Sequence, residues 1–156
     1  MTKKDDNLMA LDKQICFALT VASRSVVSAY RDVLAPLGIT HPQYLVLLAL
    51  WENEPLSLSK LSALLRQEAG TLSPLVKRLE HQGLLTRSRL PNDERTLSIA
   101  LTERGREMRN EASDIPTKMA ERLGMSHKEI ADLHASMMRL IEHTANYEAQ
   151  AKASAK

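Results

Sequence analysis

The sequence predicts a mainly α-helical fold that carries one small β-hairpin. Through most of the 156 residues, apolar side chains recur every three or four positions, which is the spacing of helices with one buried face. After Gly83 the pattern changes to strand-like alternation in LLTRSRL and RTLSIALT, which flank the turn segment PNDE. The length suits a single domain with a substantial core.

The first helix is expected over residues 8–34, where an apolar stripe follows the helical period. Pro36 and Gly38 then break the pattern. The residues of the stripe are Leu8, Leu11, Ile15, Leu19, Ala22, Val26 and Tyr30.

The second helix is expected to begin after Thr40 and to run to about Asn53. Thr40 is its predicted N-cap, with Pro42 in the first turn and Gln43 at the capping-box position. The segment YLVLLALWEN is apolar on most sides, which indicates burial, and Pro55 ends the helix.

A short helix over 56–67 and a longer helix over about 70–82 are expected next. Ser57 caps the short helix, and Gly70 is expected to form the turn between the two. Pro74 is placed within about the first turn of the longer helix, where a missing N–H costs little.

The chain is predicted to return to helix after the hairpin. Thr102 caps a helix that contains Gly105, and Pro116 is expected to bend it or locally disturb its hydrogen bonding. Gly124 ends this helix, and Ser126 caps a last helix that runs to near the C-terminus.

The expected order of elements is three helices, then a hairpin, then further helix. This is the order in a winged helix-turn-helix protein. In that arrangement the helix at 70–82 enters the DNA major groove, and the hairpin is the wing that follows the backbone. The winged helix part is expected over about 42–101, flanked by long helices at about 8–34 and 102–150.

Composition excludes several classes of protein. No apolar run is long enough to span a bilayer, and the N-terminus lacks the apolar segment of a signal peptide. Cys16 is the only cysteine, so no internal disulfide forms and a reducing, cytoplasmic setting is expected. No phosphate-binding loop, dinucleotide turn or nucleophile elbow is present, and no cofactor is expected.

Charge distribution is more informative than the net charge of +2. A local basic excess can neutralise DNA phosphates, although a solvated helix face would show the same pattern. The basic residues between 77 and 95 are Lys77, Arg78, Arg87, Arg89 and Arg95, against Glu80, Asp93 and Glu94.

The segment GTLSPLVKRLEHQGLLTRSRLPNDERTLSIALTERG resembles the core of the MarR family of bacterial transcription regulators. The DER at the wing tip and the LTxxG helix start carry most of this likeness. The resemblance covers nearly the whole chain. It implies a cytoplasmic homodimeric repressor, with the flanking helices as the dimer interface and palindromic half-sites on double-stranded DNA.

The segments ICFAL, AYRDVLAPLGIT and HPQYLVLLALWE resemble the organic-hydroperoxide-sensing (OhrR) branch of that family more closely. By this resemblance Cys16 is the redox sensor and the Tyr30 hydroxyl supports it. Two positions depart from the branch: His41 and Thr20 stand where tyrosines occur. A histidine at 41 could still hydrogen-bond to the thiolate or to Tyr30, or it could indicate a different effector.

A sensing thiol would attack the O–O bond of a peroxide as its thiolate and become a sulfenic acid. No second cysteine is available, so a mixed disulfide with a low-molecular-weight thiol, or further oxidation, would follow. The helical period places Cys16 at the edge of the stripe, half-buried, and at least one turn inside its helix. The alternative is that this thiol is a small apolar side chain in the core.

The resemblance also assigns DNA contacts. Residues at the start of the reading helix are expected to touch bases or phosphates, although Thr71 or Ser73 could instead be a helix cap. Arg95 resembles the wing arginine that enters the minor groove, with Asp93 orienting it. The expected DNA-binding residues are Thr71, Ser73, Pro74, Lys77, Arg78, Arg87, Arg89, Asp93 and Arg95.

Two other functional hypotheses follow from the same residues. A phenolic or aromatic acid could be the effector, bound between the dimer helices and the reading domain, with Cys16 structural. A thiol peroxidase using Cys16 is a less favoured alternative. The five histidines do not form a compact set with metal-ligand spacing, so no metal site is expected, and Trp51 is expected to be a core anchor.

Overall fold

The computed structural model describes residues 8–90 and 92–154. They form two compact units that divide between Ile115 and Pro116. The first contains a 3₁₀ turn (Leu11–Lys13), α1 (Ile15–Leu34), a second 3₁₀ turn (Ala35–Leu37), α2 (His41–Asn53), β1 (Leu56–Ser57), α3 (Leu58–Leu65), α4 (Ala69–His81), β2 (Leu85–Leu90), β3 (Asp93–Leu101) and α5 (Glu103–Glu111). Then come α6 (Ile115–Leu123), at the division, and α7 (His127–Ser154).

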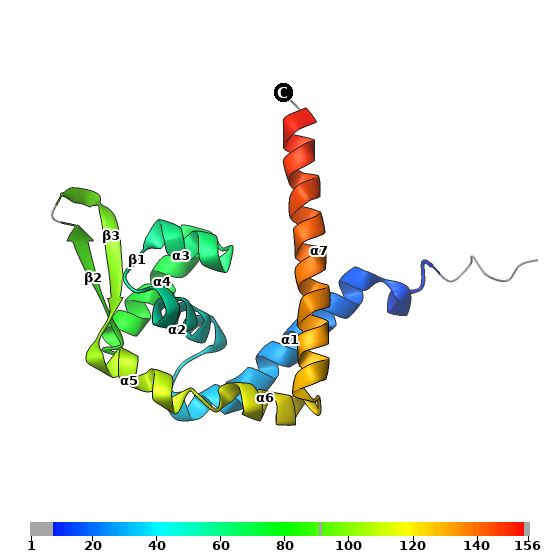
Figure 1. The fold of residues 1–156 in the computed structure, drawn as a ribbon, viewed down its shortest axis with the longest axis horizontal. Coiled ribbons are helices and arrows are strands. Elements are labelled where there is room, and N and C mark those ends of the chain that lie inside the picture. Colours follow the sequence, from blue (N-terminus) through cyan, green and yellow to red (C-terminus); the bar gives the residue numbers. More distant parts are fainter. Residues whose placement is uncertain (1–7, 91, 155–156) are drawn as a thin grey trace, which may run out of the picture. The chain divides into compact units, whose positions relative to one another are not determined.

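The predicted winged helix is confirmed, with α2, α3 and α4 gathered beside the hairpin (Figure 1). The sheet is antiparallel with the order β1-β3-β2. β2 and β3 pair from Leu85 with Leu101 to Arg89 with Leu97, and the register shifts after Arg89. The two-residue strand β1, which pairs Leu56 with Ile99, was not expected.

The core lies in the first unit and joins the helices to the hairpin. Its members recur at helical spacing on α2 and α4, which explains why these segments are helices with one buried face. The largest fully buried side chains are Leu34, Val46, Leu47, Leu50, Leu61, Leu72, Val76, Leu79, Leu85, Ile99 and Ile115.

The predicted helix caps are confirmed. Thr40 and Gln43 form a reciprocal capping box on α2, and Ser57 accepts the backbone N–H of Lys60 at the start of α3. Thr102 accepts the N–H of Gly105 on α5, and the Ser126 hydroxyl accepts the N–H of Glu129 on α7. Each side chain satisfies an N–H that the first helical turn leaves without a carbonyl partner.

Four helix boundaries differ from the expectation. The first α-helix begins at Ile15 rather than near residue 8, because Gln14 is extended between the 3₁₀ turn and α1. Arg66, with φ 51°, makes the turn after α3, and Gly70 lies inside α4. Pro74 is therefore the sixth residue of α4, just beyond the first turn.

The fourth difference concerns the helix expected to bend at Pro116. The structure has two helices, α5 and α6, separated by residues 112–114. Pro116 is the second residue of α6, where its fixed φ suits a helix start and its missing N–H needs no partner.

Close packing against Leu84 explains why position 105, in the first turn of α5, is a glycine. A Cβ at this position would lie 2.0 Å from the carbonyl oxygen of Leu84, so α5 can approach the turn before β2 only without a side chain here. The Gly105 carbonyl also accepts the indole N–H of Trp51 at 2.9 Å. Trp51 is part-buried and joins α2 to α5, as expected of an anchor.

The two long helices keep most of their apolar surface uncovered. Leu34 is the only buried residue of α1, and α7 buries none of its described residues. Ile15 is 61% exposed and Val21 is 43% exposed on α1, and Leu133 is 50% exposed on α7. Among the described residues, no single helix is long and apolar enough to cross a membrane; only α1 with its following turn and α2, bent by 70°, meet that test together.

Candidate DNA-binding face and thiol site

Helix α4, predicted to read DNA, presents a polar face opposite its buried residues. Leu72, Val76 and Leu79 hold it to the core, which leaves the other side of the helix to solvent. Of the predicted contact residues on α4, Ser73 is part-buried and four are exposed: Thr71, Pro74, Lys77 and Arg78. The structure therefore brings this part of the predicted set together on one helix.

Capping does not explain the hydroxyls of Thr71 and Ser73. The N-cap of α4 is Glu68, whose carbonyl accepts the backbone N–H of Thr71 at 3.0 Å. The alternative that either hydroxyl serves as the cap is therefore wrong. Hydroxyls near a helix N-terminus are suited to contact phosphates or base edges.

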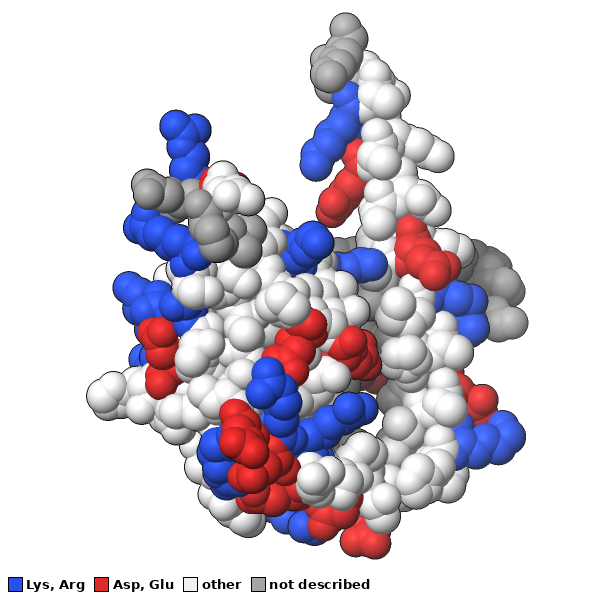
Figure 2. All heavy atoms as spheres, turned by 60° about the vertical axis from the view of Figure 1, so that its left-hand side comes forward, with Lys and Arg blue, Asp and Glu red and all other residues white. Residues whose placement is uncertain are grey.

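The wing arginines lie together. Arg87, Arg89 and Arg95 line a groove of about 490 Å³ with Leu97, since alternate residues of β2 share one face and β3 pairs beside it. Figure 2 shows Lys and Arg side chains crowded at the upper left, beside the hairpin. Such a cluster suits a polyanion such as DNA.

Asp93 orders the backbone at the tip of the wing. Its carboxylate accepts the backbone N–H of Arg95 at 3.0 Å and the hydroxyl of Thr96. These hydrogen bonds hold the pKa of Asp93 below its usual value. Arg95 thus bonds to Asp93 through its backbone N–H. Asp93 thereby positions the strand that carries the Arg95 guanidinium.

Arg87, which was expected to meet phosphate or merely solvent, is paired with Glu80. Its Nη2 lies 2.6 Å from Glu80 Oε2, its Nε donates to the same oxygen at 2.7 Å, and its backbone N–H donates to Oε1 at 3.2 Å. This pairing keeps the pKa of Glu80 below its ordinary value. Sequence reasoning counted Glu80 only as an offset to the basic residues, although it stands seven positions before Arg87 across a short turn.

Cys16 is exposed and is the second residue of α1. Both expectations for its surroundings, half-burial and a position at least one turn inside the helix, are therefore wrong. The cause is the late start of α1 after the extended Gln14.

Thr20 stands at one of the two positions that depart from the hydroperoxide-sensing branch. Its hydroxyl donates to the Cys16 carbonyl oxygen at 2.7 Å. This bond runs from the Thr20 side chain to the backbone of α1 and does not involve the thiol.

Tyr30 and His41 form an aromatic contact. Their ring centroids lie 4.7 Å apart, and Tyr44 adds a third ring 5.9 Å from Tyr30. Burial raises the pKa of Tyr30 and lowers the pKa of His41. Near neutral pH the pair therefore consists of a phenol and a neutral imidazole.

Within one chain, Tyr30 does not lie close to Cys16. Both lie on α1, 14 positions apart, so they are separated by about 21 Å along the axis at 1.5 Å per residue. The predicted sensor residues are therefore not assembled within a single chain, although Tyr30 and His41 do meet.

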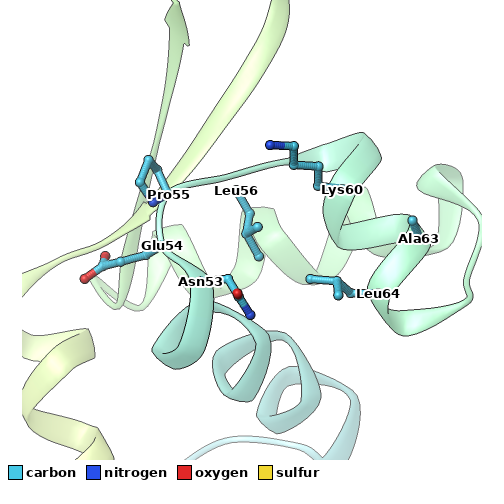
Figure 3. A pocket seen from close by; sticks show the side chains of 7 residues that line it. All are labelled: Asn53, Glu54, Pro55, Leu56, Lys60, Ala63 and Leu64. Atoms are coloured by element: carbon cyan, nitrogen blue, oxygen red, sulfur yellow. The ribbon is translucent and has the colours of Figure 1, made fainter.

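Two other features lie outside these sites. An open groove of about 500 Å³ lies between the end of α2 and α3. The side chains that line it, drawn in Figure 3, are Asn53, Glu54, Pro55, Leu56, Lys60, Ala63 and Leu64. None of the predicted site residues lines it. Within residues 8–90 and 92–154, no group of three His, Cys, Asp or Glu side chains could hold a metal ion.

Comparison with known proteins identifies the family. The model of the MarR family matches residues 39–97. The organic hydroperoxide resistance transcriptional regulator of Bacillus subtilis (strain 168) is 41% identical over 142 residues, which cover 91% of this chain and 96% of that protein. The chain belongs to the MarR family. It is a DNA-binding transcription regulator and not an enzyme, which excludes the thiol peroxidase.

Other MarR-family relatives are also similar over most of the chain. The regulator SarZ of Staphylococcus epidermidis is 35% identical over 84% of this chain and 88% of its own length. The structure of reduced AbfR bound to DNA superposes with a TM-score of 0.73, at 31% identity over 89% of this chain and 97% of that one. AbfR of Staphylococcus epidermidis is also known in an overoxidized form bound to DNA and in a disulfide-formed state.

Proposed function

We propose that this MarR-family regulator is a cytoplasmic dimeric repressor that leaves its DNA when an organic hydroperoxide oxidises Cys16. The observation that carries the proposal is the placement of the only cysteine in the first turn of α1, where it is exposed in the single chain and follows Ile15, an apolar residue proposed below for the dimer interface. The similarity to the hydroperoxide resistance regulator, and to AbfR, whose reduced form is bound to DNA and which also forms a disulfide, supports thiol chemistry of the same kind.

Dimerisation is proposed from the uncovered apolar faces. The helices at about 8–34 and 102–150 would supply the interface, while about 42–101 reads DNA. Exposed apolar residues such as Ile15, Val21 and Leu133 favour burial against a second copy. Since Tyr30 lies about 21 Å along α1 from Cys16 in its own chain, a Tyr30 that supports the thiol must come from the partner subunit.

The proposed chemistry uses one thiolate and one peroxide. The Cys16 sulfur attacks one oxygen of the O–O bond and is oxidised by two electrons to a sulfenic acid, while the other oxygen takes a proton and leaves as an alcohol. A low-molecular-weight thiol then condenses with the sulfenic acid, releasing water and forming a mixed disulfide. The added bulk in the interface would shift the long helices and change the spacing of the two reading helices.

DNA binding is proposed to use both arms of the winged helix. The exposed face of α4 enters the major groove, and Arg89 and Arg95 of the wing contact the backbone and the minor groove. A two-fold dimer would place its half-sites about one helical turn apart on a palindrome. The contacts from α4 are Thr71, Ser73, Pro74, Lys77 and Arg78.

The test is a gel shift with the DNA upstream of the protein's own coding sequence. Equimolar cumene hydroperoxide is expected to release the wild type and to leave Cys16→Ser bound. If both proteins stay bound or both release alike, Cys16 is structural. The second candidate, an aromatic-acid effector near the half-buried His41, would then be favoured, and release by such acids would be measured.

Arg95→Ala is expected to weaken DNA binding by about tenfold, because an exposed wing cation is lost. The slope of log K against log salt should fall in magnitude by about 0.9 per subunit. Lys128→Ala removes one cation from α7 that is not among the proposed contact residues, and should change neither quantity. Equal effects of the two substitutions, measured by fluorescence anisotropy, would contradict the assignment of Arg95.

A further inference from the structure

One carboxylate joins the reading helix to the wing. Glu80 lies in the last turn of α4, and both of its oxygens accept hydrogen bonds from β2. Oε2 takes the Arg87 guanidinium, at 2.6 Å from Nη2 and 2.7 Å from Nε, while Oε1 takes the backbone N–H at 3.2 Å. The contact therefore involves the strand itself as well as its side chain.

Apart from this pair, a short turn connects α4 to β2. Gly83, with φ 74°, turns the chain, and the N–H groups of Gly83 and Leu84 bond back to the carbonyls of Glu80 and Leu79. These bonds end the helix but do not reach β2. The Glu80–Arg87 pair lies beyond the turn, where it can hold the strand against the helix.

The pair also lies beside the proposed DNA-binding face. Glu80 is seven residues after Ser73, two helical turns along the same flank of α4. Arg87 lines the wing groove together with Arg89 and Arg95. The side chains of Arg87 and Glu80 are 25% and 34% exposed, so water screens the pair only in part.

A carboxylate beside DNA repels the phosphates and lowers affinity, so a carboxylate at this place calls for a compensating role. We propose that Glu80 is a positioning residue for DNA binding, which acts through Arg87 to hold the wing at the angle where helix and wing reach DNA together. Arg87 is then part of this support and makes no phosphate contact of its own. The inference rests on the DNA-binding face proposed above and is independent of the thiol chemistry.

The test compares DNA affinity and its salt dependence for the reduced wild type, four variants of the pair and one control variant by fluorescence anisotropy. Glu80→Gln removes a negative charge yet is expected to weaken binding by about fivefold or more, because coupled pairs of this kind lose their geometry when one member changes. Arg87→Gln should weaken binding by a similar factor with an unchanged salt slope. The double variant should be no weaker than either single variant.

Arg87→Lys separates the two roles of the arginine. A lysine keeps the charge that a phosphate contact needs but cannot reproduce the contact of two guanidinium nitrogens with Glu80. We therefore expect Arg87→Lys to bind as weakly as Arg87→Gln. Binding close to wild type, or a salt slope that falls by about 0.9 per subunit in Arg87→Gln, would show a direct phosphate contact and overturn the inference.

Glu68→Gln is the matched control, because it removes a carboxylate at the other end of α4 whose side chain makes no capping bond. Its affinity should stay the same or rise. Unchanged or raised affinity in Glu80→Gln as well would overturn the positioning role. If neither the wild type nor Glu68→Gln binds DNA, the proposed DNA-binding face itself is refuted. Circular dichroism melting of each variant confirms that the compared proteins are folded.

Discussion

Gly105→Ala is expected to lower the free energy of unfolding by about 3 kcal/mol and the Tm by roughly 6–12 °C. The added Cβ would lie 2.0 Å from the Leu84 carbonyl oxygen and 3.2 Å from Leu101 Cδ2. Backbone atoms cannot yield as a side-chain tip can, so α5 must move away from the turn before β2. The hydrogen bond from Trp51 to the Gly105 carbonyl, 2.9 Å long, would weaken with that movement.

Gly70→Ala provides the control with the opposite sign. Gly70 also lies in a helix, and nothing lies within 4 Å of a Cβ built there. Alanine is favoured over glycine in a helix by about 1 kcal/mol, so this substitution should leave the Tm unchanged or raise it. A Gly105→Ala protein that melts at or above the wild-type Tm would show that α5 does not need this close approach.

Tyr30→Phe is expected to slow the reaction of Cys16 with hydroperoxide by about ten- to a hundredfold, the value of a hydrogen bond to a charged group. The helix α1 makes the origin of that hydroxyl testable, because Cys16 and Tyr30 of one chain lie about 21 Å apart along it. Two tagged chains, one Cys16→Ser and one Tyr30→Phe, can be co-expressed and purified as a heterodimer. Its only cysteine then faces a partner that carries Tyr30, and it should react at the wild-type rate.

The reciprocal heterodimer pairs a wild-type chain with a chain that carries both substitutions. Here the only cysteine shares its chain with Tyr30 but faces a partner with phenylalanine. A slow reaction is expected, followed by stopped-flow mixing and thiol quantification. The reverse result, fast here and slow in the first heterodimer, would place the supporting tyrosine in the same chain and contradict the shared site.

Local chemistry made much of the fold predictable. Thr40, Ser57 and Thr102 cap helices as expected, because a cap depends only on a side chain and an N–H three residues later. The hairpin follows from strand alternation on both sides of a turn, and the buried face of α4 follows from the helical period. These signals sit within short windows of sequence.

Features that depend on chain geometry beyond those windows were mispredicted. The stripe that begins at Leu8 continues through Gln14, so periodicity alone extended the helix and misplaced Cys16 inside it. Pro116 suits a bend and a helix start equally, and only the packed chain distinguishes them.

The candidate site shows the same limit. The residue types on α4 and the wing were predicted, but the bond between Glu80 and Arg87 depends on how the strand returns beside the helix. The separation of Cys16 from Tyr30 likewise depends on both lying on one uninterrupted helix.

Parallel measurement of thiol oxidation and DNA release tests the central claim most directly. Reduced protein bound to its upstream DNA is titrated with cumene hydroperoxide in steps below one equivalent per subunit. At each step, anisotropy gives the released fraction and intact-protein mass spectrometry gives the fraction modified at Cys16. The two fractions should rise together and be complete near one equivalent. Release while Cys16 remains unmodified, or full modification while the DNA stays bound, would contradict the thiol switch.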